Sequence, residues 1–402
     1  MRGSQERIIT SHVGSLSRPD DLIAANKQRE QGGFADERKF QELLQAAVIG
    51  VVRRQKEVGV DVPNDGEFGK SMGHPVNYRA WLSYAFTRLS GLQHDNPPDV
   101  PPRLAKPGDL SIAGMARRRD RTKFTAAYND PNSNISIGPE PFVRPICVGP
   151  VKYTGQDAIK ADIAHFKTAL KENGVAEGFM TAIAPGAVAR LGNTYYKTDD
   201  EFVFACADAM REEYKAIVDA GLVLQLDDPG IAENWDQIVP EPSLEAYKRF
   251  TMVRVEALNH AIKGLPEDRI RFHLCWGSWH GPHVTDLPMR DVIDLMLAIK
   301  CDGYSFEAAN VRHEHEWEVW QDVKLPSHKF ILPGIVSHAT NVVEHPDLVA
   351  QRILRFTNIV GRERVIGSTD CGLGGRIHPD IAWAKLEALA QGAAIASKKL
   401  WR

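Results

Sequence analysis

The chain has 402 residues, of which 43% are hydrophobic and 25% charged, and its formal net charge is −3. This composition is typical of a soluble globular protein, and the small net charge gives no general attraction to nucleic acid or to an anionic membrane surface. The sequence shows no bilayer-spanning apolar stretch, no signal peptide, and no regular spacing among its five cysteines. We therefore expect a cytoplasmic protein with reduced cysteines that binds neither nucleic acid nor membrane.

Short apolar runs typical of β-strands alternate along the chain with longer patterns typical of helices. The predicted strands, in chain order, are residues 7–13, 59–63, 178–183, 221–226, 270–275, 304–306, 330–336 and 364–369. The predicted helices are residues 36–58, 199–220, 244–263, 289–298, 346–360 and 381–400. Strand–helix repeats with polar residues at the strand ends predict an α/β fold, a (βα)8 TIM barrel. A doubly wound sheet is the alternative, but no Gly-x-Gly-x-x-Gly follows the first strand.

One stretch, residues 93–154, interrupts this alternation. It contains Pro-Pro twice, a basic run at residues 117–121, and a segment at residues 144–154 that is typical of a β-ribbon. We expect a single domain, residues 1–402, with 93–154 as an inserted excursion after the second βα unit. The basic run is either a solvated loop or a site for an anionic group of a substrate, a cofactor or a neighbouring subunit.

Four potential metal ligands follow predicted strands: His273, Cys275, Glu307 and Cys371. The strand ends of a parallel barrel converge on one rim, and two cysteines, a histidine and a glutamate suit zinc. His273 and Cys275 alone are equally compatible with a buried cysteine beside a chance histidine. The matching positions of Glu307 and Cys371 favour a metal site, and ligands spread over three strand ends disfavour a purely structural zinc, which local Cys and His pairs normally hold.

A zinc site of this composition predicts a reaction at sulfur. The reactive form of a thiol is the thiolate, and coordination to zinc removes the thiol proton. Two cysteinates keep the metal electron-rich, which preserves the nucleophilicity of a substrate thiolate and weakens the activation of water. The sequence therefore favours S-alkylation over hydrolysis.

Several motifs between Ser11 and about Gly375 resemble those of one family, in order and in context. They are Val13-Gly14-Ser15, Asp65-Gly66-Glu67, Leu226-Asp227-Asp228-Pro229, His273-x-Cys275, Glu307, and Asp370-Cys371-Gly372-Leu373. They are similar to motifs in the C-terminal catalytic module of cobalamin-independent methionine synthase, in its shorter single-module form. The resemblance implies a (βα)8 barrel with a catalytic zinc held by the four ligands, and transfer of a methyl group to a thiol. It also implies that Glu307 moves aside when the thiol arrives.

The resemblance also implies a substrate site. Gly14 and Ser15 would contact the amino-acid substrate, and Glu67 and Asp227 would hold its ammonium group through paired charges. A turn or helix-capping role is the alternative for each of these carboxylates.

Two further residues have implied roles in the chemistry. His338 resembles the family's proton-donating histidine, and an imidazole that titrates near neutrality would protonate a leaving group. A polar residue on the rim is the alternative. Asp228 would orient a donor or pair with a base on the rim.

The predicted partners are a small-molecule thiol, with homocysteine as the default, and an alkyl donor, with 5-methyltetrahydrofolate as the default folate co-substrate. The family's folate-stacking tryptophan has no counterpart in residues 181–190, and Trp276 stands where the family does not usually have one. The alternative is a zinc-dependent thiol alkyltransferase or lyase that acts on another electrophile, such as an epoxide with coenzyme M. The sequence leaves open whether the chain forms a homo-oligomer.

Overall fold

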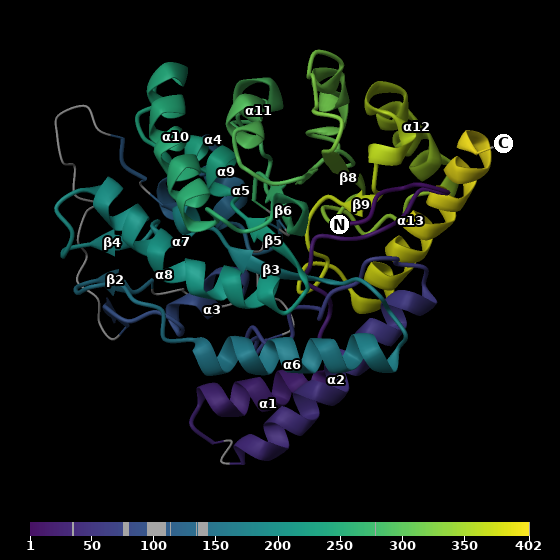
Figure 1. The fold of residues 1–402 in the computed structure, drawn as a ribbon. Helices are drawn as coiled ribbons and strands as arrows, with labels where there is room; N and C mark the ends of the chain where they lie inside the picture. Colours follow the sequence, from purple (N-terminus) through teal and green to yellow (C-terminus); the bar gives the residue numbers. More distant parts are fainter. Residues whose placement is uncertain are drawn as a thin grey trace.

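A computed structural model describes residues 1–33, 36–74, 80–94, 110–112, 114–133, 135, 144–277 and 279–401. Figure 1 shows a strand-lined centre with helices around it. Helices α6, α2 and α1 lie along one side of the molecule, and α10, α11 and α12 along the opposite side. None of the helices in the described part of the chain combines the length and the hydropathy that a bilayer crossing requires.

The core of the described fold is a parallel sheet with the strand order β3-β5-β6-β7-β8-β9. These strands are β3 (Phe179–Ile183), β5 (Val223–Asp227), β6 (Ile270–Leu274), β7 (Gly303–Phe306), β8 (Phe330–Val336) and β9 (Ser368–Thr369). Their residues are almost all buried, which is expected where helices cover the outside of a parallel sheet and side chains fill its inside. Six of the predicted strands therefore lie where the sequence placed them, the last of them only in its final two residues.

Two short segments close the sheet into a barrel. Thr10 pairs in parallel with Gly367 beside β9, and Asn64 pairs in parallel with Phe179 of β3. The two segments meet because the amides of Asp61 and Val62 donate to the Thr10 carbonyl at 3.1 and 3.0 Å. Together with the strands of the main sheet they complete a (βα)8 TIM barrel.

The first two barrel segments are shorter than the sequence predicted, for a local reason. The amide of Thr10 donates to Oδ2 of Asp61 and the amide of Val13 to Oγ1 of Thr369, so side chains replace ladder partners. Pro63 has no N–H to offer a ladder. Residues 7–13 and 59–63 therefore form bridges at the predicted places in the barrel and not continuous strands.

Long helices surround the barrel and connect its strands. They are α2 (Glu37–Glu57), α6 (Gln156–Glu172), α8 (Asp199–Asp219), α10 (Leu244–Ala261), α11 (Met289–Leu297), α12 (Pro346–Val360) and α13 (Pro379–Leu400). Their starts follow capping rules: Thr198 accepts from the amide of Glu201 before α8, and Ser243 accepts from the amide of Ala246 before α10. The shorter helices are α1 (Asp20–Glu30), α3 (Ala80–Phe86), α4 (Arg119–Lys123), α5 (Thr125–Asn129), α7 (Pro185–Val188) and α9 (Gly230–Gln237), and 3-10 turns lie at η1 (Met115–Arg117), η2 (Glu267–Arg269), η3 (Glu314–Gln321) and η4 (Arg362–Arg364).

The predicted excursion lies between the second barrel segment and α6, the helix that leads to β3. In its described parts, β1 (Leu92–Gln93) pairs antiparallel with β2 (Ile146–Cys147), and β2 pairs in parallel with β4 (Gly192–Asn193). Much of the predicted excursion, residues 95–109 and 136–143 among them, lies outside the described residues. The described parts of the excursion thus lie ahead of α6, the helix of the second βα unit, whereas the sequence predicted an excursion after that unit.

The basic run at residues 117–121 is not simply a solvated loop, because two of its arginines pack against the protein. Arg118 is 1% exposed, and its Nε donates to Oδ2 of Asp236 at 2.5 Å. Arg119 pairs with Glu241 and donates to the carbonyl of Trp235. These two arginines bind the chain's own carboxylates and attach the excursion to α9, whereas Arg117 is exposed to solvent.

Candidate metal centre and active site

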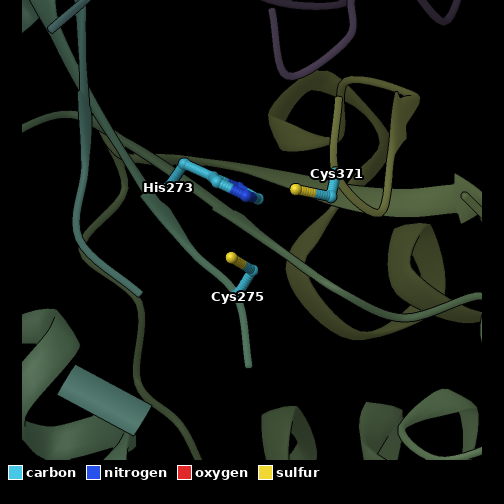
Figure 2. Close-up of side chains that lie close together, drawn as sticks. All are labelled: His273, Cys275 and Cys371. Carbon is cyan, nitrogen blue, oxygen red and sulfur yellow. The ribbon is translucent and has the colours of Figure 1, made fainter. Parts of the chain in front are cut away.

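Three potential metal ligands converge at the carboxyl ends of two barrel strands. His273 lies on β6, Cys275 follows that strand, and Cys371 follows β9; their ligand atoms all lie within 4.8 Å of one another. Figure 2 shows the imidazole of His273 and the two sulfur atoms pointing toward a common space. His273 and Cys275 are two residues apart, so an extended backbone turns both side chains to the same face. All three are buried, at 2%, 6% and 6% exposure respectively.

The histidine has the arrangement of a ligand with one nitrogen held and the other available. Nδ1 of His273 lies 3.1 Å from Oγ of Ser305 on the neighbouring strand β7. Nε2 is buried and has no hydrogen-bond partner among the described residues. A second partner that fixes the ring is common for metal-binding histidines, and buried polar atoms are rarely left unpaired. The donor set therefore fits a soft or borderline metal ion such as zinc.

A hydrogen bond between the two cysteine side chains shifts their pKa values in opposite directions. The hydrogen bond between the thiols lowers the pKa of Cys371 well below its usual value, with Arg376 also favouring the thiolate. The same hydrogen bond, with burial, raises the pKa of Cys275 well above its usual value. One thiolate is thus favoured even in the chain alone, and thiolates are the ligands that zinc requires.

Glu307 belongs to a second buried group beside the first. Its carboxylate lies with His338 and Asp370, and their ligand atoms are within 4.8 Å of one another. Oε1 of Glu307 accepts from the amide of Trp276 at 2.9 Å, and Oε2 accepts from Nδ2 of Asn310 at 2.6 Å. Burial raises the pKa of Glu307 well above its usual value, and the charge of Cys371 adds to the rise. The structure thus places the fourth predicted ligand next to the His–Cys–Cys group, held by two donors of its own.

His338 and Asp370 complete this second group. His338 follows β8, and burial lowers the pKa of its imidazole to about 3, so the ring is neutral at pH 7 in the chain alone. This differs from the near-neutral titration expected from the sequence, because the ring is 3% exposed. Asp370 accepts from the amides of Ala308 and Ala309 at 2.7 and 2.8 Å. It therefore holds the turn after Glu307, a role that its place directly before Cys371 did not reveal.

Glu67 and Gly14 face each other across the rim. Glu67 is 4% exposed, and its Oε1 accepts from Oγ1 of Thr181 at 2.6 Å. Gly14 has a φ of +144°, and a Cβ there would lie 2.6 Å from Oε1 of Glu67, so only glycine fits. Lys70, which sequence reasoning missed, lies 3.4 Å from Oε1 of Glu67 and donates to Thr181 at 2.6 Å. Its spacing of three residues from Glu67 was the available signal.

Ser15 joins the segment that carries Cys371. Its carbonyl accepts from the amides of Leu373 and Gly374, both at 2.9 Å. Ser15 itself is partly exposed. The turn at Gly14 and Ser15 therefore lies against the loop just after the third metal-ligand candidate.

Asp227 and Asp228 end β5, the strand next to β6. Asp227 pairs in register with His273, and its Oδ1 accepts from Nε2 of Gln225 at 2.8 Å. Burial raises the pKa of Asp227 to about 7, with the charge of Glu67 adding to the rise. Burial likewise raises the pKa of Asp228 to about 6, a rise that the charge of Arg190 opposes. Asp227 and Asp228 therefore lie on the same part of the rim as Glu67 and His273.

Two tryptophans follow Cys275 closely, and both are packed. Trp276 is fully buried and stacks on His313 with a ring-centroid distance of 4.0 Å. Trp279 is 4% exposed, with the guanidinium of Arg118 at 3.3 Å from its ring centroid. The Trp279 ring also stacks on His283 at 3.8 Å. Both rings thus serve as packing partners of the loop after β6.

The chain is similar to known proteins over most of its length. Residues 109–394 match the family model described as the catalytic domain of cobalamin-independent synthase. A methionine synthase of Thermococcus kodakarensis is 24% identical over 98% of this chain and 94% of its own length. One of Saccharolobus solfataricus is also 24% identical, over 98% and 96% of the respective lengths.

Solved structures show the same fold. A B12-independent methionine synthase from a Shewanella species, in complex with selenomethionine, has a TM-score of 0.69 at 18% identity, covering 98% of this chain and 99% of that one. A putative vitamin-B12 independent methionine synthase from Listeria monocytogenes has a TM-score of 0.62 at 20% identity, with 98% and 99% coverage. The family model spans most of the barrel, from the excursion to α13, and includes His273, Cys275 and Cys371. The chain therefore belongs to the cobalamin-independent methionine synthase family of methyltransferases.

Proposed function

We propose that the protein is a zinc-dependent methyltransferase that moves a methyl group from a donor such as 5-methyltetrahydrofolate to a thiol such as homocysteine. The observation that supports this most is the buried convergence of His273, Cys275 and Cys371, with Nε2 of His273 unpartnered among the described residues. The relatives named as methionine synthases, matched over 94–96% of their length, support the choice of substrates.

In this proposal His273, Cys275 and Cys371 would hold a zinc ion, and Glu307 would complete the set until the thiol binds. Bound zinc would supply the lowering of the thiol's pKa that makes it a nucleophile at neutral pH. The donors on Glu307, from Trp276 and Asn310, offer its carboxylate a second resting position. The buried surroundings of the three ligands keep competing water away.

The remaining residues would bind the substrate and move its proton. Gly14, Ser15, Glu67 and Asp227 line the polar end of an amino-acid thiol, with the carboxylates facing its ammonium group. His338, neutral at rest, takes up the proton that the thiol loses and passes it to the departing atom of the donor. The sulfur gains the methyl carbon while the donor's bond to that carbon breaks, so the leaving group receives both the electron pair and this proton. Asp228 orients the donor at the adjoining strand end.

A second candidate is transfer to a thiol from a different electrophile, such as an epoxide. One observation favours it. Trp276 and Trp279, the tryptophans closest in sequence to Cys275, are 0% and 4% exposed and already packed against His313, Arg118 and His283. A donor with a large planar ring finds no exposed face on either of them.

The test is turnover by the zinc-loaded protein with homocysteine and 5-methyltetrahydrofolate, measured as methionine formed. We expect methionine to form, and His338→Gln to slow turnover by about 10²-fold, the scale of a lost general acid. Homocysteine binding should be unchanged in His338→Gln. The exposed His328→Gln is the matched control and should match the wild type. Unchanged turnover in His338→Gln would exclude its proton role, and consumption of epoxide and thiol without methionine formation would favour the second candidate.

A further inference from the structure

Arg190 lies at the end of the turn that follows β3, on the same rim as the metal-centre candidates. Its side chain is 3% exposed, and Nη1 donates to Oε2 of Glu233 at 2.8 Å. The other edge of the guanidinium carries Nε and Nη2. Both of these nitrogens are buried and have no hydrogen-bond partner among the residues that the structure describes.

The Nε–Nη2 edge is the part of arginine that recognises oxyanions. Its two N–H groups are parallel, and their spacing matches the two oxygens of a carboxylate. Leaving such donors buried without a partner costs free energy, and folded proteins rarely do so. Arg190 thus has one nitrogen paired with Glu233 and an Nε–Nη2 edge whose two donors are buried and unpaired among the described residues, the geometry that an oxyanion would satisfy.

A second buried polar group lies near this turn. Asn234 on α9 is fully buried, and neither Oδ1 nor Nδ2 has a hydrogen-bond partner within the described parts of the chain. Asn234 is the neighbour of Glu233, which anchors Arg190. A Cβ on Gly230 would lie 3.0 Å from Nδ2 of Asn234 and 2.7 Å from Oδ1 of Asp228, so this amide stands beside the Asp228 carboxyl.

Glu233, the partner of Arg190, lies against the loop that carries Cys275. A Cβ on Gly277 would lie 3.2 Å from the carboxyl carbon of Glu233, and Gly277 is two residues beyond Cys275. On the other side, a Cβ on Gly186 would lie 2.8 Å from Oδ2 of Asp228. Arg190 thus stands between the loop that carries Cys275 and the strand end that carries Asp227 and Asp228.

We propose that Arg190, through Nε and Nη2, binds the carboxylate of a substrate of the reaction at the metal centre. This assignment rests on the proposed function and deepens it, because it requires one of the two substrates to carry a carboxylate. The carboxylate belongs either to the thiol or to the alkyl donor. The anchored edge at Glu233 fixes the orientation of the guanidinium, so the carboxylate binds in one direction and aligns its substrate on the rim.

The experiment compares substrates that differ only in the carboxylate. Calorimetry measures the binding of homocysteine and of 3-aminopropane-1-thiol, which is homocysteine without its carboxylate, to zinc-loaded wild type and Arg190→Met. In a second arm it measures the binding of 5-methyltetrahydrofolate to both proteins. We expect Arg190→Met to weaken the binding of either homocysteine or 5-methyltetrahydrofolate by about 10-fold or more, the scale of a charged hydrogen bond. The affinity for 3-aminopropane-1-thiol should not change. The arm that responds identifies the source of the carboxylate.

Three further variants separate recognition from structure. Arg190→Lys keeps the charge without the fork and should recover only part of the lost affinity. Glu233→Gln removes the anchor's charge but leaves the fork, and should bind the carboxylate substrate more tightly than Arg190→Met does. Arg211→Met is the matched control, because Arg211 on α8 donates to the carbonyl of Ala261 at the end of α10, and it should bind as the wild type. Equal binding of all three ligands by wild type and Arg190→Met, or equal losses in Glu233→Gln and Arg190→Met, would overturn the assignment.

The same samples distinguish this inference from the proposed function. In cobalt-substituted protein, a thiol that enters the metal shell produces a cobalt–thiolate absorption band. If homocysteine gives no such band but its affinity still depends on Arg190, the carboxylate site stands and the proposed reaction fails. If the band forms and no ligand depends on Arg190, the reaction stands and the carboxylate site is wrong.

Discussion

Glu67 shows how the backbone of a single residue positions a side chain on the rim formed by the carboxyl ends of the barrel strands. Its φ of +62° is rare for a residue with a side chain and costs free energy wherever the surroundings do not hold it. Here Oδ1 of Asp65 accepts from its amide at 2.9 Å, and Arg18 donates to its carbonyl at 2.5 Å. The strained backbone directs the carboxylate across the rim to Thr181, into the space that Gly14 leaves open.

If Glu67 and Asp227 face a substrate ammonium, the loss of either charge should weaken the binding of only those thiols that carry an amino group. Glu67→Gln and Asp227→Asn should each weaken homocysteine binding by roughly 1.5–3 kcal/mol, the scale of a charged hydrogen bond. Binding of 4-mercaptobutanoate, which is homocysteine without its amino group, should change little, and zinc content should stay at the wild-type level. Calorimetry with the two thiols checks this, and equal losses for both would assign these carboxylates a structural role instead.

For single residues, the sequence predicted which side chains converge better than it predicted their hydrogen-bond partners. His273, Cys275 and Cys371 converge as expected, because residue type and a shared strand-end position determine their placement. The hydrogen-bond partners of these residues were not predictable. Ser305 on the neighbouring strand β7 contacts His273, and Asn310, three residues beyond Glu307 in the same loop, donates to Glu307, and both side-chain directions depend on barrel packing. Lys70 and Arg190 were missed because a lysine or arginine is by default a surface residue.

Among the elements, the loop after β6 is held by contacts from two neighbouring segments. Arg118 and Tyr128 from the excursion hold Trp279, the latter through a hydrogen bond of 2.7 Å to its Nε1. His313 from the loop after β7 supports Trp276 by stacking at 4.0 Å. The position of Cys275 therefore depends on contacts with both the excursion and the next barrel loop.

His313 makes this support sensitive to pH. Burial opposes its protonation, but hydrogen bonds to Asp286 and Glu316 outweigh burial and raise the pKa of His313 to about 10. An unfolded histidine titrates near 6.5, so the stabilisation is fully present below that pH and is lost as pH rises through about 10. The free energy of unfolding of the wild type should fall over this range by up to about 1.4 kcal/mol per pH unit more than that of His313→Gln.

Chemical denaturation at a series of pH values between 6 and 10 measures the two slopes. His328→Gln, at an exposed histidine, should follow the wild type. Parallel slopes for wild type and His313→Gln would show that the charge on this ring does not stabilise the loop.

The long helices were the elements that the sequence predicted best. Helix α12 has the predicted bounds, and α8 and α10 differ from prediction by one or two residues, because capping residues and periodic apolar positions mark them locally. Helix α6 and α9 were not predicted. Helix α9 is buried along its whole length, so its sequence shows no alternation of exposed and buried residues to detect.

For the whole molecule, the barrel explains why residues almost a hundred positions apart share one site. Cys275 and Cys371 follow β6 and β9, and closure of the sheet through Thr10 and Asn64 brings all strand ends to one rim. Repeats of strand and helix predicted this closure from the sequence. The docking of the excursion was not predictable, because it rests on long-range ion pairs such as Arg118 with Asp236, which no local pattern encodes.

The central claim is that His273, Cys275 and Cys371 hold a zinc ion at which a substrate thiol is activated. X-ray absorption at the zinc edge of the zinc-loaded protein tests it, before and after addition of homocysteine, with Cys371→Ser as the comparison. We expect two sulfur neighbours from Cys275 and Cys371 at rest, a third sulfur in place of an oxygen or nitrogen neighbour after homocysteine is added, and no stoichiometric zinc in Cys371→Ser. Full zinc content in Cys371→Ser, or a zinc shell that does not change under turnover conditions, would contradict the claim.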